Sequence, residues 1–264
     1  MITDTIPNAA RYTALHPDFA DAVRLLQTLD FAALPDGQVP CANAYAQYSQ
    51  DPEGLDGLLA AHLTVMRQMA STIQESAAIE SGQIRITLKN ASWLDEMREL
   101  NGPSTEELPL CEPLAGDILL VYMLDLSTAM RSMTQADADK LGLSDRTKLR
   151  ETALDNIRRL IRQDGLETDR AEGHSLCQIR LDGFYDTALV LLLDEILHDD
   201  AVLAANPVFS VPARDALLLC NPADEESLYA LADLTRQAYD ESAYTVSDIL
   251  YQYHKGSISI FQSH

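Results

Sequence analysis

The chain has little lysine and cysteine and no long apolar segment. Only four of its 264 residues are lysines, and its four cysteines are far apart, without CxxC or Cys/His ligand spacing. This pattern predicts reduced thiols in a cytosolic protein. No stretch approaches the roughly 20 apolar residues needed to span a bilayer. The first residues also lack the basic start and apolar run of a signal peptide. We therefore expect a soluble, cytoplasmic protein.

Catalytic sequence motifs are missing as well. The sequence contains no GxSxG, P-loop or GxGxxG pattern, and no cysteine has a persuasive histidine partner. These absences leave no specific enzyme class indicated, although they do not exclude catalysis. The sequence names no cofactor and no metal site.

What the chain has in excess is acid. Asp and Glu number 41 against 19 Lys and Arg, for a formal charge of −22. Such a charge repels nucleic acid and anionic membranes and favours a basic protein partner. An acidic, lysine-poor composition is also typical of proteins from salt-adapted or GC-rich organisms, so two explanations of the charge stay open.

The first third of the chain is predicted to be helical. Apolar residues recur with helical spacing over residues 19–29, and a linker with two prolines and a glycine follows at 34–40. Asp51, followed by proline and glutamate, is typical of a helix start, and the apolar stripe then continues to residue 73. We expect a helical N-terminal portion over residues 1–81.

Beyond this portion the pattern changes to that of an α+β domain over residues 82–264, with a mixed sheet, packed helices and a C-terminal β-hairpin. The two portions can also form one continuous globule. The expected strands are 83–88, 116–125, 174–181, 207–211 and 216–220. The expected helices are 134–142, 144–165, 187–198 and one from 221 onward. Residues 89–113 are expected to be largely a loop, and the C-terminal hairpin is expected to turn at Lys255 and Gly256.

Several segments occur together in a recognisable order. The apolar strand ending at Tyr122-Met-Leu-Asp-Leu126 is followed by the helix 149–160 and by Leu181-Asp-Gly-Phe-Tyr-Asp-Thr-Ala188. The segment 208–219 and the closing Tyr-rich hairpin come next. As a set they resemble the YtpQ-like family of bacterial cytosolic proteins over roughly residues 115–262. That family has no established function, so the resemblance implies a location and a fold and assigns no catalytic residue.

The first candidate site is the turn from Asp182 to Asp186, which carries two carboxylates at a strand-to-helix junction. Two acids placed there can hold a divalent cation or act as general acid and base. The structural alternative is that Gly183 permits the turn and Asp186 caps the first amides of the buried helix. We favour the structural alternative.

Acidic residues also crowd the end of the 187–198 helix. Glu195 and His198 have the spacing of metal ligands on one helical face. There is no HExxH pattern and no identifiable third ligand, so an exposed acidic helix end is the favoured interpretation.

Basic residues gather in one segment only. Arg146, Arg150, Arg158 and Arg162 are spaced by multiples of four, with Lys148 and Arg159 nearby. An arginine stripe of this kind can bind phosphate or carboxylate groups. The favoured alternative is that the stripe pairs with acids of the same protein.

Two further charged positions flank apolar strands. Arg214 and Asp215 lie in the turn between the 207–211 and 216–220 strands, and Arg131 follows the strand that ends at Asp125. Such charges either pair for structure, as Arg131 can do with Asp125, or gather around a pocket. The candidate binding residues are therefore the four stripe arginines and Arg214, and the candidate catalytic residues are Asp125, Asp182 and Asp186.

Three functions follow as hypotheses. The first is a non-enzymatic acidic adaptor, regulator or immunity-type inhibitor that binds a basic protein, with DNA and membranes disfavoured as partners. The second is a metal-assisted hydrolase or nuclease using Asp182 and Asp186. The third is a nucleotide or RNA sensor using the arginines of segment 146–162.

Overall fold

The computed structural model describes residues 79–101, 108–126, 130–204 and 206–262. They belong to the unit Ile79–His264, one of two into which the chain divides. The helices predicted within residues 1–78 therefore lie outside the described residues. In the described part of the chain, no helix is both long and apolar enough to cross a membrane.

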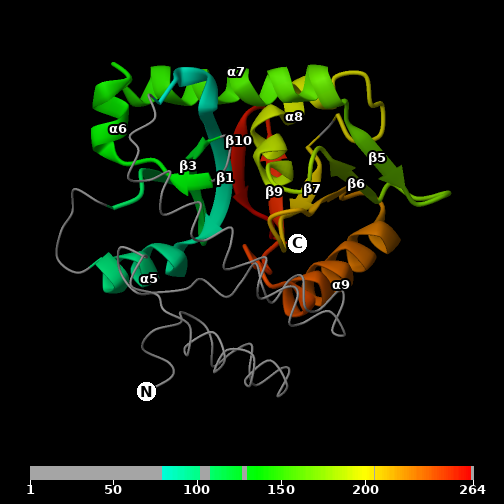
Figure 1. Cartoon of the computed structure of the whole chain (residues 1–264). Coiled ribbons are helices and arrows are strands. Elements are labelled where there is room, and N and C mark those ends of the chain that lie inside the picture. The colour runs from blue at the N-terminus through cyan, green and yellow to red at the C-terminus, as the bar shows by residue number, and fades with distance from the viewer. Residues whose placement is uncertain (1–78, 102–107, 127–129, 205, 263–264) are drawn as a thin grey trace, which may run out of the picture. The chain divides into compact units, whose positions relative to one another are not determined.

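The described residues form an α+β unit with two antiparallel sheets (Figure 1). The first has the strand order β1-β3-β2, with β4 also paired to β3, and the second has the order β10-β9-β7-β8-β6-β5. The strands are β1 (Ile84–Asn90), β2 (Cys111–Ala115), β3 (Ile118–Asp125), β4 (Met130–Ser132), β5 (Glu167–Arg170), β6 (Cys177–Arg180), β7 (Val208–Ser210), β8 (Leu217–Cys220), β9 (Tyr251–His254) and β10 (Ser257–Ile260).

The predicted α+β class is confirmed, but the expectation of one mixed sheet is wrong. Every strand pairing among the described residues is antiparallel. Parallel neighbours need a crossover of about a dozen residues or more. Here β2 and β3, and likewise β9 and β10, are consecutive strands joined by two-residue turns. Such short connections allow antiparallel pairing only.

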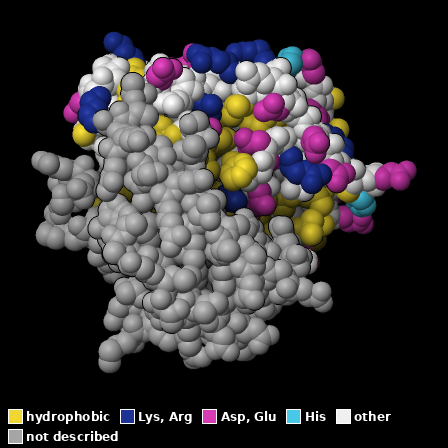
Figure 2. All heavy atoms as spheres, viewed as in Figure 1, with side chains coloured by type: hydrophobic (Ala, Val, Ile, Leu, Met, Phe, Trp, Pro, Cys, Tyr) yellow, Lys and Arg dark blue, Asp and Glu magenta, His cyan; other side chains and the backbone are white. Residues whose placement is uncertain are grey.

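Helical segments pack on these sheets. They are η2 (Ser81–Gln83), α5 (Ala91–Asn101), α6 (Gln135–Lys140), α7 (Arg146–Asp164), the 3₁₀ segment η3 (Asp186–Leu192), α8 (Leu193–Ile196) and α9 (Glu225–Glu241). Figure 1 shows α7 along the top of the unit and α9 on the opposite side, below the second sheet. The basic side chains in Figure 2 gather along the edge that α7 occupies.

Local sequence signals fix most helix starts. Asp145 accepts hydrogen bonds from the amides of Thr147 and Lys148 and so caps α7. Thr134 caps α6 in a capping box with Asp137, as predicted. The start of α9 was expected at Asn221, but the N-cap is Asp224, whose carboxylate accepts from the Ser227 amide.

Strand β8 is buried along its whole length because both faces of the second sheet are covered. Leu217 and Leu219 belong to the main core. Leu218 and Cys220 point the other way and pack with Leu231 of α9 in a second cluster. Side chains alternate between the two faces of a strand, so an unbroken apolar run is expected where helices or other layers cover both.

Two stretches differ from their predicted structure. The expected loop 89–113 contains α5 and β2, and the expected helix 187–198 is a 3₁₀ segment followed by one α-helical turn. The second stretch is apolar on nearly every side, so its sequence contains no periodicity that distinguishes helix types. The C-terminal hairpin is confirmed: Lys255 and Gly256 both have positive φ, at 47° and 78°, as a type I′ turn requires.

Candidate functional site

The two carboxylates of the 182–186 turn have different environments. Asp182 is exposed, and its Oδ1 accepts hydrogen bonds from the amides of Phe184 at 2.9 Å and Tyr185 at 2.8 Å. Asp186 is completely buried, and its Oδ1 accepts from the Leu181 amide at 2.8 Å. The expected cap is therefore corrected: Asp186 is itself the first residue of η3, so its carboxylate bonds backward to the preceding strand end.

Burial raises the pKa of Asp186, and the nearby charge of Asp182 acts in the same direction. Oδ2 of Asp186 has no hydrogen-bond partner among the described residues. In that part of the chain, no group of three His, Cys, Asp or Glu side chains is arranged to hold a metal ion. The geometry of this turn is that of a structural turn with one buried acid.

Asp125, the third catalytic candidate, pairs with a residue that the sequence did not suggest. Its Oδ2 lies 3.7 Å from Nε of Arg85, whose guanidinium lies 6.0 Å from the ring centre of Tyr185. Arg131 instead binds Asp137 through two hydrogen bonds of 2.6 and 2.8 Å. The β3–β4 register explains the corrected partner, because it places Arg131 opposite Leu124 and therefore on the other face from Asp125.

The arginines of α7 reach in several directions. Residues on an α-helix are about 100° apart, so positions 146 and 162 differ by about 160° around the axis. Arg146 donates to Gln135 at 2.8 Å, and Arg150 lies 3.9 Å from Glu112. Arg158 bonds Glu195 at 2.6 Å and Asp155 at 2.7 Å. These contacts support the favoured interpretation that the arginines serve the protein's own side chains; Arg162 is exposed.

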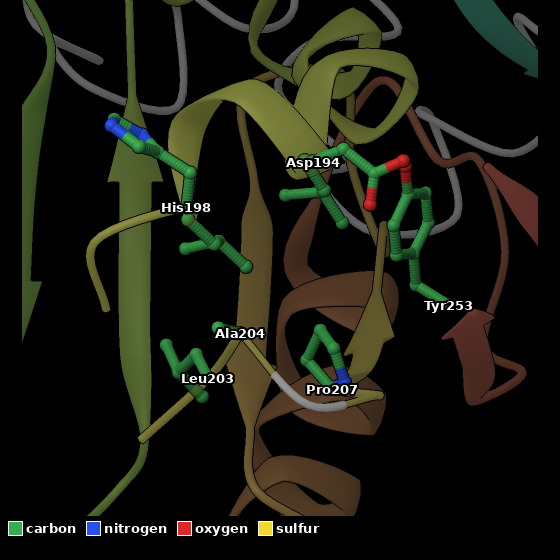
Figure 3. Close-up of a pocket in the computed structure, with 8 residues that line it drawn as sticks. Asp194, His198, Leu203, Ala204, Pro207 and Tyr253 are labelled. Atoms are coloured by element: carbon green, nitrogen blue, oxygen red, sulfur yellow. The ribbon is translucent and has the colours of Figure 1, made fainter. Parts of the chain in front are cut away.

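Glu195 and His198 do not converge on a shared site. The Glu195 carboxylate accepts from Arg158, whereas the His198 ring approaches the Glu195 carbonyl oxygen through Nδ1 and Asp199 through Nε2, each at 2.9 Å. In Figure 3 the His198 ring points away from the neighbouring cavity.

That cavity measures about 40 Å³ and lies between the α8 region, the residues Leu203, Ala204 and Pro207, and Tyr253 of β9. Figure 3 shows the Asp194 carboxylate directed at the Tyr253 hydroxyl. Burial and this acid raise the pKa of Tyr253 to about 12. A water molecule needs about 10–15 Å³ by this measure, so the cavity holds a few waters at most and does not fit a metabolite.

Arg214 lies among aromatic rings. Its guanidinium carbon is 3.8 Å from the ring centre of Tyr244 and 5.0 Å from that of Phe184. Its positive charge also lowers the pKa of Lys89, after burial, which is the larger cause. Sequence analysis singled out Arg214 but missed Lys89. The strand β1 contains two cations, Arg85 and Lys89, and nothing local in the sequence distinguishes Lys89 from Arg85.

The outer side of α9 is a second feature that sequence analysis missed. The buried residues of the helix, Ser227, Leu231 and Thr235, recur every four positions and so lie on one side of it. The exposed residues on the other side are Glu226, Tyr229, Asp233, Arg236, Gln237 and Asp240. Tyr229 is 73% exposed, the highest value among the exposed large apolar side chains. We call Glu226, Tyr229, Asp233 and Asp240 the α9 outer face.

Comparison with known proteins adds no relative. No family model, no curated protein and no solved structure matches this chain. The resemblance to the YtpQ-like family therefore stays a prediction.

Proposed function

We propose that this protein is a non-enzymatic binding protein that recognises a basic protein partner through the α9 outer face. The observation that carries the proposal is the composition of that face: one exposed tyrosine surrounded by three exposed acids. Aromatic side chains supply much of the binding energy at protein interfaces. Surrounding charges accelerate association with a partner of opposite sign.

The charge of the whole unit supports this partner class. Residues 79–264 contain 32 acidic residues and 16 basic ones. On α9, Arg236 is the single cation and lies 3.6 Å from Asp233. The helix carries five acids against this one cation, so its net charge stays negative. A basic surface approaching α9 therefore meets a net negative potential.

The helix is also a rigid platform. Asp224 caps its start, and Leu231 packs under it against β7 and β8. Thr235 Oγ1 donates to the Leu231 carbonyl oxygen at 2.6 Å and lies 2.7 Å from Ser210 Oγ of β7. The backbone of such an element is already ordered before a partner arrives, which reduces the entropy lost on binding.

We place this function in the cytoplasm. Cys111, Cys177 and Cys220 are free thiols. Burial raises the pKa of Cys177 to about 11 and that of Cys220 to about 12. Protonated, buried thiols react slowly. They are typical of proteins kept in reducing compartments.

Quantitative co-purification tests the proposal. The protein is isolated from its own cells in three forms: the natural chain, an E226Q/Y229A/D233N/D240N variant, and a D164N/E167Q/E172Q variant. Both variants lose three negative charges, but only the first changes α9. We expect a basic protein that co-purifies with the natural chain and with the control and is lost from the α9 variant.

Two results contradict the proposal. If the basic protein is lost equally from both variants, total charge, and not the α9 outer face, determines binding. Equal recovery with all three forms shows that binding occurs elsewhere. The unfolding temperature of each variant, measured in parallel, shows whether the α9 variant is folded.

A further inference from the structure

The end of β1 lies beside the segments that precede β8 and β9. Asn90, next to Lys89 at the end of β1, donates through Nδ2 to the Val246 carbonyl oxygen at 2.8 Å. The Val246 amide donates to the Pro212 carbonyl oxygen at 2.9 Å, and the Arg214 amide donates to that of Tyr244 at 3.1 Å. The Lys89 side chain lies on the other face of β1, which it shares with Arg85. On that face the Arg85 guanidinium contacts the ring of Tyr185, and the preceding residue, Phe184, contacts Arg214. Together these contacts bring Lys89 and Arg214, 125 positions apart in the sequence, into one region of the fold.

Arg214 differs from the other arginines in its environment. Six arginines of the described ranges are half-buried, and five of them form an ion pair: Arg85, Arg131, Arg150, Arg158 and Arg170. Arg214 is the sixth and has no acid partner in that part of the chain. Its guanidinium carbon lies over the rings of Tyr244 and Phe184. Ring contacts of this kind hold the guanidinium while leaving its N–H edge available to an acceptor.

Lys89 differs from the other lysines in the same way. Lys140, Lys148 and Lys255 are exposed, whereas Lys89 is half-buried, with Nζ 5.8 Å from the ring centre of Trp93. No carboxylate of the described residues forms an ion pair with it. The pKa of Lys89 is lowered by burial and by Arg214, the direction expected of a cation that lacks a counter-ion.

We propose that Lys89 and Arg214 form the binding site for the phosphate group of a small, ring-bearing phosphate monoester. The two cations match the two charges of a phosphate monoester, and arginine provides paired donors for its oxygens. Phe184, beside Arg214, is 46% exposed and offers its free surface to the ring of the ligand. This inference is independent of the α9 outer face and of the proposed partner.

Calorimetric titration of the full chain tests the site, with inorganic phosphate and adenosine monophosphate as probes at low salt. We expect both to bind and the nucleotide to bind more tightly. R214Q should lower the affinity for phosphate and the affinity for the nucleotide by at least about tenfold each. R180Q removes an exposed arginine of β6 and should leave both affinities unchanged. F184A should weaken nucleotide binding more than phosphate binding, because it removes the ring contact with the nucleotide as well as one of the two rings beside Arg214.

Thermal unfolding of a K89M variant provides a second readout. Methionine fits a similar volume and removes the unpaired charge, so without phosphate the variant should unfold at a temperature equal to or above that of the natural chain. It should also lose the rise in unfolding temperature that phosphate gives to the natural chain. The proposal is overturned if neither probe binds at millimolar concentration, or if K89M and R214Q bind phosphate as the natural chain does.

Discussion

Asn156 of α7 donates a hydrogen bond from Nδ2 to the backbone carbonyl oxygen of Ile84 at 2.9 Å, across 72 positions of sequence. It donates a second to Ser81 at 2.7 Å. At the other end of the same strand edge, the Leu88 amide donates to Thr187 Oγ1 at 3.3 Å. Side chains thus bind backbone groups along the edge of β1 opposite β3, which would otherwise be open to pairing with another chain.

The first prediction concerns this edge. N156A should lower the free energy of unfolding by about 1–3 kcal/mol, because it removes two hydrogen bonds, to the carbonyl oxygens of Ser81 and Ile84, and leaves the Ile84 oxygen with Arg85 Nη1 alone, at 3.1 Å. Urea denaturation measures the change. Q163A, on the exposed side of the same helix, should change stability by less than about 0.5 kcal/mol. Equal effects of the two variants would show that Asn156 contributes only helix propensity.

The second prediction concerns pH. Burial acts to raise the pKa of Asp137, but hydrogen bonds from Arg131 and Thr134 outweigh it and lower the pKa to about 2. A carboxylate whose pKa is lower in the folded than in the unfolded chain stabilises the protein at any pH above its pKa in the unfolded chain. That contribution, about 2 kcal/mol, is lost as the pH falls from about 4 to about 2.

Urea unfolding of the natural chain and of D137N across this acid range measures the contribution. The stability of D137N should depend less steeply on pH, whereas D164N, which changes an exposed acid, should follow the natural chain. Parallel curves for the natural chain and D137N would show that the ion pair with Arg131 does not stabilise the fold.

The third prediction separates a structural Asp186 from a metal ligand. The pKa of Asp186 is raised by burial, so its contribution is fully present at low pH and is lost as the pH rises through the folded-state value. D186N keeps an acceptor for the Leu181 amide and removes the charge. It should match or exceed the stability of the natural chain at neutral pH, whereas D186A should lose about 1 kcal/mol.

Magnesium titrated during thermal unfolding completes this test. If both acids are structural, magnesium should change the unfolding temperature of the natural chain no more than that of D182N or D186N. A rise in the natural chain that disappears in both variants would favour the metal-assisted hydrolase instead.

The fourth prediction concerns the turn between β2 and β3. Gly116 has φ of +53°, and a Cβ there would lie 3.2 Å from atoms of Tyr251 and Ile260. G116A should therefore cost more than about 1 kcal/mol, through backbone strain and crowding together. G142A is the matched control, because Gly142 has φ of +69° but open space around its Cβ position. If the two variants lose equal stability, the turn does not pack tightly on the C-terminal hairpin.

The parts of the fold that sequence predicted are those fixed by neighbouring residues. The helix start at Thr134, the turn at Lys255 and Gly256, and the apolar strand before Asp125 all depend on contacts within a few positions. Strand β5 was missed because its sequence, Glu-Thr-Asp-Arg, is polar and largely exposed. Nothing local indicates that it pairs with β6.

The candidate sites were harder to predict because their partners come from distant elements. Arg131 and Asp125 are close in sequence, yet the strand register places them on opposite faces. The neighbourhood of Lys89 and Arg214 exists only once β1 and the 211–214 and 244–247 segments have come together. The sequence shows the charges, but only the tertiary structure shows which ones lack a partner.

The most direct test of the central claim is site-specific photo-crosslinking in the protein's own cells. A photoreactive phenylalanine analogue is placed at position 229, at the centre of the α9 outer face, and in a second strain at position 163 on α7. The account predicts one prominent cross-linked product at position 229, with a protein of net positive charge, that is weakened by added salt and absent at position 163. Products that are the same at both positions, or an acidic cross-linked protein, would contradict it.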